Sequence, residues 1–182
     1  MTAIFYETML AVISAAWCVS RAAVWVRMRR ISWKREAQLL LVYVCIAVIV
    51  RFTFCPFEKI DGRIQPLIFD PANAWPPRIN LVPFTYLFDY EKLHEALLNL
   101  IGNVLMFVPV GVVSPSVYRQ LNTHGKAIAA GVGFSLAIEL MQLPFYDRVS
   151  DIDDLLLNSA GYILGYLIYL AVRRIKRKPG CR

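Results

Sequence analysis

The chain has 182 residues, of which 58% are apolar and 18% charged, and its mean hydropathy is +0.50. A soluble domain of ordinary composition is about 45–50% apolar and about one quarter charged. The composition therefore excludes an ordinary cytosolic enzyme. At about 20 residues per membrane-spanning helix, the chain has room for about four or five spans. We predict an all-α, polytopic membrane helical bundle.

Five apolar stretches follow one another along the chain, and we predict a transmembrane helix in each. They are residues 4–26, 39–57, 97–113, 127–145 and 155–172. No Lys or Arg precedes the first stretch. That feature distinguishes it from a secretory signal peptide, so we expect a retained helix.

The connecting segments alternate between basic and acidic. Residues 27–35 and the tail 173–182 are rich in Arg and Lys, whereas residues 58–96 and 147–154 carry most of the acids. By the positive-inside rule, the N-terminus lies outside and the C-terminus is cytoplasmic. The net charge of +7 is spread over several loops rather than one face. We therefore expect no nucleic-acid partner, and instead contact with membrane lipid.

Several polar residues lie inside the predicted spans. Asn99 and Asn103 are four positions apart and share one helix face. Glu139 and Gln142 share a face of the next span, and an acid inside a span is by default a functional-site hypothesis. Two structural explanations stay open. The amides can form interhelical hydrogen bonds that only stabilise the bundle, and Glu139 can pair with Arg51.

An acidic segment precedes the fifth stretch. Asp151, Asp154 and Asn158 follow Arg148 and share one helix face. Helix capping and the positive end of the helix explain one or two of these carboxylates. Polar residues from several segments all map to the predicted outer half of the bundle. We predict that they form one outward-facing polar site: Arg78, Asn80, Asn99, Asn103, Glu139, Gln142, Arg148, Asp151, Asp154 and Asn158.

The sequence offers little sign of cofactor chemistry. It has no His-rich metal-ligand pattern and no Gly-rich phosphate loop. His94 and His124 are predicted on opposite sides of the membrane, so they cannot share a site. We expect no metal and no cofactor, and we assign no catalytic residue.

Four blocks of residues resemble the VanZ-like family in order and spacing. They are Arg78-x-Asn80-Leu81-Val82-Pro83-Phe84, Asn99-x-x-x-Asn103-x-x-x-Phe107-x-Pro109-x-Gly111, Ser135-x-x-x-Glu139-x-x-Gln142 and Arg148-x-x-Asp151-Ile152-Asp153-Asp154-x-x-x-Asn158-Ser159-x-Gly161-x-x-x-Gly165-Tyr166. The chain departs from the family pattern at Ser159 and Tyr162, where we expect Thr and often Gly. The resemblance divides the chain into an additional N-terminal transmembrane helix with a basic cytoplasmic loop (1–38), a VanZ-like membrane domain (39–172) and a basic cytoplasmic tail (173–182).

The resemblance implies a multi-pass protein of the bacterial plasma membrane. The member that gives the family its name is associated with low-level resistance to the glycopeptide teicoplanin, without replacement of the peptidoglycan precursor. We therefore interpret the chain as a cell-envelope protein that lowers susceptibility to lipid-anchored glycopeptides. Its ligand would be a lipoglycopeptide or a lipid-linked envelope precursor. The aromatic residues that follow Pro83 suit the membrane boundary, and we predict a short interfacial helix there.

Two other functions stay open. A membrane enzyme acting on a lipid-linked envelope precursor would use Glu139 and Asp154 as acid–base or metal-binding carboxylates. A transporter or flippase is the third hypothesis, although the five spans show no inverted repeat of the kind that such folds contain. We favour the non-enzymatic hypothesis.

Overall fold

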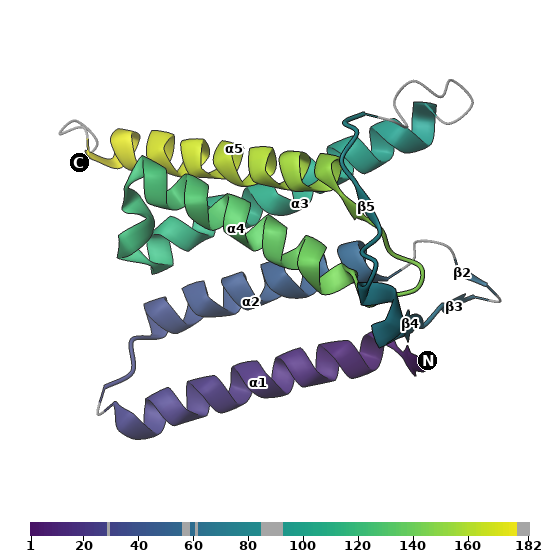
Figure 1. Ribbon diagram of the computed structural model, residues 1–182. Helices are drawn as coiled ribbons and strands as arrows, with labels where there is room; N and C mark the ends of the chain where they lie inside the picture. Colours follow the sequence, from purple (N-terminus) through teal and green to yellow (C-terminus); the bar gives the residue numbers. More distant parts are fainter. Residues whose placement is uncertain (29, 56–58, 61, 85–92, 178–182) are drawn as a thin grey trace. The chain divides into compact units, whose positions relative to one another are not determined.

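The computed structural model describes residues 1–28, 30–55, 59–60, 62–84 and 93–177. Most of this part is α-helical, which confirms the predicted all-α membrane bundle (Figure 1). The α-helices of the described chain are α1 (Tyr6–Arg27), α2 (Trp33–Phe54), α3 (Leu93–Val117), α4 (His124–Gln142) and α5 (Ile152–Arg177).

Four stretches of these helices, within the described residues, are long and apolar enough to cross a membrane. They are α1, α2, Leu97–Val117 of α3 and Ile152–Lys176 of α5. The helix α4, which corresponds to the predicted fourth span, is not among them. Its first turn contains His124 and Lys126, and its last turns contain Glu139 and Gln142. Polar side chains thus occupy both ends of a helix of 19 residues, and its crossing of the membrane stays a prediction.

Short strands, which the sequence did not predict, connect the helices. β1 (Thr2–Ile4) pairs antiparallel with β4 (Leu67–Phe69). β2 (Lys59–Ile60) and β3 (Arg63–Ile64) form an antiparallel hairpin. β5 (Ile79–Asn80) pairs in parallel with β6 (Ser150–Asp151). Two 3₁₀ helices, η1 (Pro71–Ala74) and η3 (Arg119–Asn122), complete the described connections. The interfacial helix predicted after Pro83 falls on residues 85–92, which lie outside the described chain, as do residues 178–182 of the tail.

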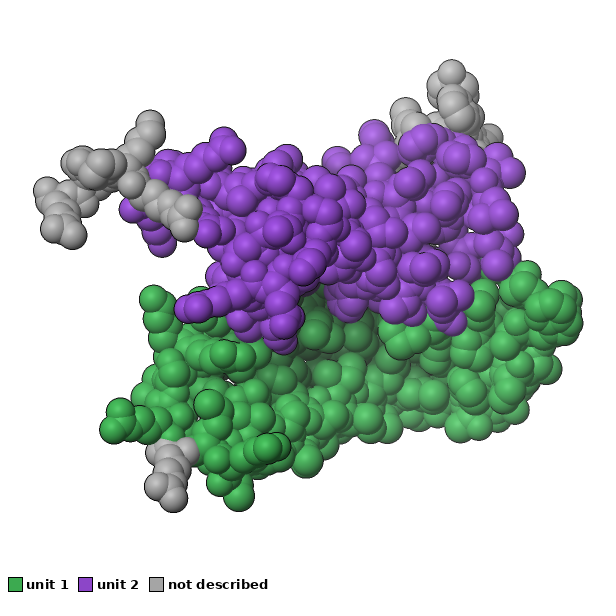
Figure 2. Space-filling model, turned by 60° about the vertical axis from the view of Figure 1, so that its left-hand side comes forward, with its two compact units in different colours: residues 1–78, 141–149 green, residues 79–140, 150–182 purple. Residues whose placement is uncertain are grey.

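The chain divides into two compact units, which Figure 2 distinguishes by colour. Unit 1 comprises residues 1–78 and 141–149, and unit 2 comprises residues 79–140 and 150–182. The link after α4 belongs to unit 1 together with α1, α2 and the strands β1 to β4. Unit 2 contains α3, most of α4, α5 and the parallel pair β5–β6.

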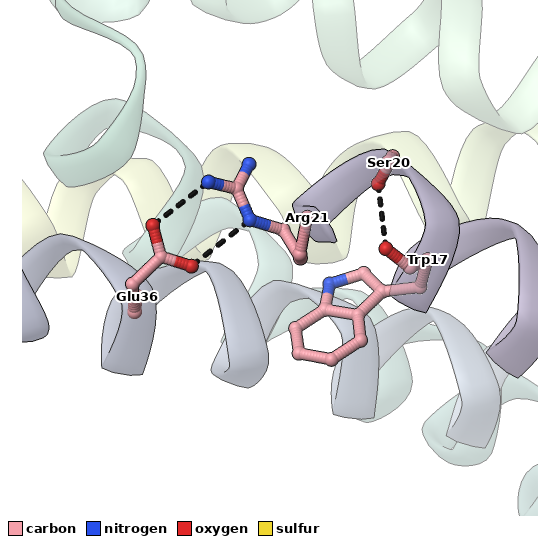
Figure 3. A network of polar contacts seen from close by, with 4 residues as sticks. All are labelled: Trp17, Ser20, Arg21 and Glu36. Carbon is pink, nitrogen blue, oxygen red and sulfur yellow. Dashed lines mark hydrogen bonds and ion pairs between the residues drawn. The ribbon is translucent and has the colours of Figure 1, made fainter. Parts of the chain in front are cut away.

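In unit 1, α1 and α2 form a helical hairpin held by polar and aromatic contacts. Arg21 of α1 donates two hydrogen bonds to the Glu36 carboxylate of α2, from Nε to Oε2 at 2.9 Å and from Nη2 to Oε1 at 2.7 Å (Figure 3). The hydroxyl groups of Ser14 and Tyr43 form a hydrogen bond of 2.6 Å, and the ring centroids of Trp17 and Tyr43 lie 5.1 Å apart. No described residue of α1 is buried.

In unit 2, α3 and α5 lie side by side along much of their length (Figure 1). A Cβ atom added at Gly161 or Gly165 of α5 would stand 2.2 Å from the Val104 carbonyl oxygen or 2.1 Å from the Val108 carbonyl oxygen of α3. The contacts advance in the same direction along both helices, so α3 and α5 run parallel. Gly111 approaches the Tyr162 carbonyl oxygen equally closely, at 2.1 Å for an added Cβ. Small residues therefore allow backbone-to-backbone packing, as the Gly161-x-x-x-Gly165 spacing indicates.

Candidate functional site

The site is built around the first turn of α5. β6 leads directly into this helix, and the Asp151 Oδ1 atom accepts a hydrogen bond from the backbone N–H of Asp153 at 2.9 Å. Asp151 is thus the N-cap of α5. Asp153 and Asp154 occupy the first turn, where the positive end of the helix dipole stabilises carboxylates. This local preference explains why the helix starts here and why acids gather at its start.

Glu139 joins the end of α4 to β6. Glu139 is buried, with only 3% of its surface exposed. Its Oε2 atom accepts a hydrogen bond from the backbone N–H of Asp151 at 2.9 Å and another from the Ser150 hydroxyl at 3.2 Å. A buried carboxylate is costly without donors, and β6 supplies two. Glu139 therefore fixes the start of α5 relative to α4.

Asn80 brings the segment before α3 to the same place. The parallel pairing of β5 with β6 sets Asn80 opposite Asp151. The Asn80 Nδ2 atom donates to Asp151 Oδ2 at 3.0 Å, and its Oδ1 atom accepts from the backbone N–H of Val82 at 3.1 Å. Both ends of the amide are used, so Asn80 orients the Asp151 carboxylate as well as its own loop.

Asp153 is a member of the network that the sequence did not assign to the site. Both of its carboxylate oxygens accept from the backbone N–H of Phe84, at 3.0 Å and 2.8 Å. Phe84 has a φ of 57°, a left-handed conformation that is uncommon for a residue other than glycine. Helix periodicity placed Asp153 on another face of α5, and it does bind a different segment. One sequence signal could have indicated this role of Asp153. The segment that ends at Phe84 and the acidic segment that contains Asp153 are both among the family-like blocks, so contact between them could be expected.

Asn103 connects α3 to α5. Its Nδ2 atom donates to Asp154 Oδ1 at 2.5 Å, and both residues are half-buried. Asn99, in contrast, is exposed, whereas we expected both amides to face the neighbouring helices. Sharing a helix face therefore did not give the two amides the same surroundings: Asn103 reaches Asp154, and Asn99 lies at an exposed position of α3.

Asn158 lies one turn further along α5, on the same face as Asp154. It is 1% exposed, and its Oδ1 atom has no hydrogen-bond partner among the described residues. Nearby, the Ser135 hydroxyl of α4 and the Ser159 hydroxyl of α5 both donate to the Leu155 carbonyl oxygen, at 3.5 Å and 2.6 Å. A polar layer therefore continues from the acidic network into the helix-packing region of unit 2.

Three predicted site residues belong to unit 1, where they bind backbone carbonyl groups. Gln142 Nε2 donates to the Thr53 carbonyl oxygen at 2.8 Å, and Arg148 donates to that of Phe54 from Nε at 3.2 Å and Nη2 at 2.7 Å. These carbonyls end α2, whose last turn lacks intrahelical donors. Arg78 Nη2 donates to the Phe145 carbonyl oxygen at 2.9 Å. In unit 1, these side chains stabilise the end of α2 and the link after α4.

The suggested Glu139–Arg51 ion pair stays a prediction, because Arg51 belongs to unit 1 and Glu139 to unit 2. Within unit 1, Arg51 lies over the ring of Tyr6 with 5.6 Å between the guanidinium carbon and the ring centroid. Within unit 2, Glu139 accepts hydrogen bonds from β6. The convergence of Glu139, Arg148 and Asp154 in one pocket stays a prediction.

The network in unit 2 concentrates acceptor groups. Its carboxylates belong to Glu139, Asp151, Asp153 and Asp154, and Glu139 lies within electrostatic range of Asp151 and Asp154. No group of three or more His, Cys, Asp or Glu side chains could hold a metal ion in the part of the chain that the structure describes. Chemically, the arrangement is suited to attract cationic groups and accept hydrogen bonds from a polar ligand.

Comparison with known proteins identifies the family. A sequence profile of the VanZ/LLP1 family matches residues 40–173, and the chain belongs to this family. Protein VanZ of Enterococcus faecium is 27% identical over 107 residues, which make up 59% of this chain and 62% of that protein. The chain thus spans about 62% of the length of this curated relative. No solved structure matches the chain. With its membrane-length helices, the chain is a multi-pass membrane protein related to VanZ.

Proposed function

We propose that this member of the VanZ/LLP1 family lowers the susceptibility of the bacterial envelope to lipid-anchored glycopeptides such as teicoplanin. The proposal rests on one observation above all: the acidic network at the start of α5 joins residues from β5, α3, α4 and β6. Such a network presents a polar surface beside membrane-length helices. A glycopeptide with a polar body and an apolar anchor fits that combination.

The hydrogen bonds favour binding over catalysis. Asp151 and Asp153 use both carboxylate oxygens to hold neighbouring donors, and Glu139 holds two donors with one oxygen. A general acid must carry a proton that it can release to a substrate. Because these carboxylates already hold donors of the protein itself, we favour a role in holding a ligand over a role in transferring protons.

The decisive test is drug susceptibility with and without the Asp154 charge. We expect expression of the chain in a susceptible Gram-positive host to raise the inhibitory concentration of teicoplanin and leave that of vancomycin unchanged. Asp154→Asn should return the host to its original susceptibility at normal protein abundance, because the amide keeps the shape and removes the charge. Asp147→Asn is the matched control, since it removes the same charge at an exposed position of the link after α4, in unit 1. Equal loss in both variants would contradict the proposal.

The enzyme hypothesis uses the same carboxylates and needs its own measurement. Lipid-linked envelope precursors would be extracted from cells with the chain, without it, and with Glu139→Gln. Under our proposal the precursor pool stays unchanged while drug binding to the cell surface falls. A precursor altered by the wild-type chain but not by Glu139→Gln would instead establish an enzyme.

The proposal also requires the network to face outward, which cysteine labelling tests. All four native cysteines are first replaced, and Ala72→Cys or Thr123→Cys is then introduced, both at exposed positions. We expect a membrane-impermeant maleimide to label position 72 in intact cells and position 123 only after permeabilisation. The reverse pattern would overturn the orientation that the charge distribution predicts.

A further inference from the structure

Unit 2 carries its basic residues at the end opposite the acidic network. Neither residues 118–127 nor residues 165–177 contain an acid, whereas the start of α5 is strongly acidic. Along α5, Asp154 and Arg173 are about 28 Å apart at 1.5 Å per residue. This separation is close to the thickness of the bilayer hydrocarbon core. The basic residues of the described chain at this end are Arg119, Lys126, Arg173, Arg174, Lys176 and Arg177.

One of these residues, Arg173, is held in place by Asn122 of η3. Asn122 Oδ1 accepts from Arg173 Nη1 at 3.1 Å and from the Tyr169 hydroxyl at 2.8 Å. Asn122 Nδ2 donates to the Arg119 carbonyl oxygen at 3.0 Å, and the Tyr166 hydroxyl donates to the Asn122 carbonyl oxygen at 3.2 Å. A guanidinium group has five N–H donors. The bond to Asn122 therefore fixes Arg173 while leaving donor capacity for an anion.

Helix stabilisation explains only part of this charge. Basic residues near the end of α5 are favourable, because the C-terminal end of a helix is negative. Lys126, however, lies in the first turn of α4, which contains no acid. A cation at the positive end of a helix is unfavourable unless an anion neutralises it. An anion bound near Lys126 would offset this cost.

The surface beside this basic end is apolar. Val172 and Ile175 are 43% and 64% exposed, and Leu167 and Ile168 of the preceding turn are also exposed. Tyr169, whose hydroxyl binds Asn122, belongs to the same part of α5, and tyrosines are enriched at membrane–water interfaces. A ligand here meets cationic groups at one side and apolar side chains at the other.

We propose that the headgroup phosphate of an anionic phospholipid binds at Arg173, at the end of unit 2 that also carries Arg119 and Lys126, with its acyl chains along the exposed face of α5. The charges match a phosphate, which guanidinium groups bind with two parallel hydrogen bonds. The apolar surface next to them favours a lipid over a soluble anion. The proposal does not depend on glycopeptide resistance.

Native mass spectrometry of the full chain tests the proposal. The protein would be released from nanodiscs that contain equal amounts of phosphatidylglycerol and phosphatidylcholine. We expect the wild-type chain to retain phosphatidylglycerol. Arg173→Gln should reduce that retention about tenfold, and Asn122→Ala, which frees the guanidinium, about threefold. Arg174→Gln is the matched control, because it removes the same charge from a residue that Asn122 does not hold, and it should change retention less than about twofold.

Each outcome decides the question. Equal reduction by Arg173→Gln and Arg174→Gln would mean diffuse attraction, which overturns a built site. Displacement of the lipid by inorganic phosphate at millimolar concentration would mean a soluble-anion site, which overturns the lipid assignment. Circular dichroism and thermal unfolding of each variant confirm that it is folded. Lys126→Gln, at an exposed position, provides a second variant, and unchanged lipid retention in it would also contradict the proposal.

Discussion

The helix α1 and the pair α3–α5 differ in how closely each helix packs against its neighbour. No described residue of α1 is buried, and its polar contacts with α2 rest on Arg21 and Ser14. In the α3–α5 pair, glycines bring the two backbones together, and Asn103 binds Asp154. Lipid is as apolar as a leucine side chain, so burial alone drives little helix association in a membrane. Close packing and hydrogen bonds must hold the pair, whereas α1 needs mainly to match the bilayer.

The family comparison follows the same division. The VanZ/LLP1 profile begins at residue 40, within α2, and ends at residue 173. It therefore includes the closely packed pair and excludes α1. The matched region therefore contains both the backbone-to-backbone packing of α3 on α5 and the hydrogen-bond network at the start of α5.

Breaking the backbone contact should produce the largest effect. Gly161→Ala and Gly165→Ala each place a Cβ atom against a carbonyl oxygen of α3, at 2.2 Å and 2.1 Å. Because helix backbone cannot shift locally to relieve this, we expect a loss of about 3 kcal/mol in unfolding free energy and low abundance in the membrane. Denaturant unfolding in detergent micelles measures the loss. Gly102→Ala is the control, since nothing lies within 4 Å of its added Cβ, and comparable damage there would refute the packing argument.

Removing the polar contact of the same pair should have an intermediate effect. Asn103→Leu eliminates the bond to Asp154 and should lower the unfolding free energy by about 1–2 kcal/mol. If the network is a ligand site, drug susceptibility returns while the protein remains inserted. Asn99→Leu makes the same substitution on an exposed position of the same helix and should leave both readouts unchanged. If Asn103→Leu and Asn99→Leu changed unfolding free energy and drug susceptibility equally, the bond from Asn103 to Asp154 would not be the cause of either effect.

The smallest effect is expected in the α1–α2 hairpin. Glu36→Gln weakens the bidentate pair with Arg21, both of whose side chains are largely shielded at 14% and 13% exposure (Figure 3). The Gln amide oxygen still accepts a hydrogen bond from Arg21, so we expect the loss to be about 1 kcal/mol. The double variant Arg21→Glu with Glu36→Arg should recover most of that stability in thermal unfolding. Failure to recover it would mean that geometry, rather than charge, fixes the pair.

Several features of unit 2 were predictable from periodicity. The four-residue spacing of Asp154 and Asn158 and the glycine pattern at Gly161 and Gly165 specify one face of α5, and α3 packs on that face. Capping preference placed Asp151 at the start of the same helix. These features depend on spacing along one helix, which the sequence contains in full.

What the sequence by itself determined is the set of membrane-length helices and the faces on which their polar residues lie. It could do so because a backbone in lipid must satisfy its hydrogen bonds within the helix, so apolar length and periodicity carry the information. The tertiary structure alone decided which side chains become partners. Asn99 and Asn103 share a face, yet Asn103 binds Asp154 while Asn99 is exposed. Gln142 and Arg148 match the polar pattern, yet in unit 1 they bind the carbonyl groups that end α2. Periodicity fixes the angle of a residue about its own helix axis, whereas its partner depends on how that helix packs against other segments, which periodicity does not contain.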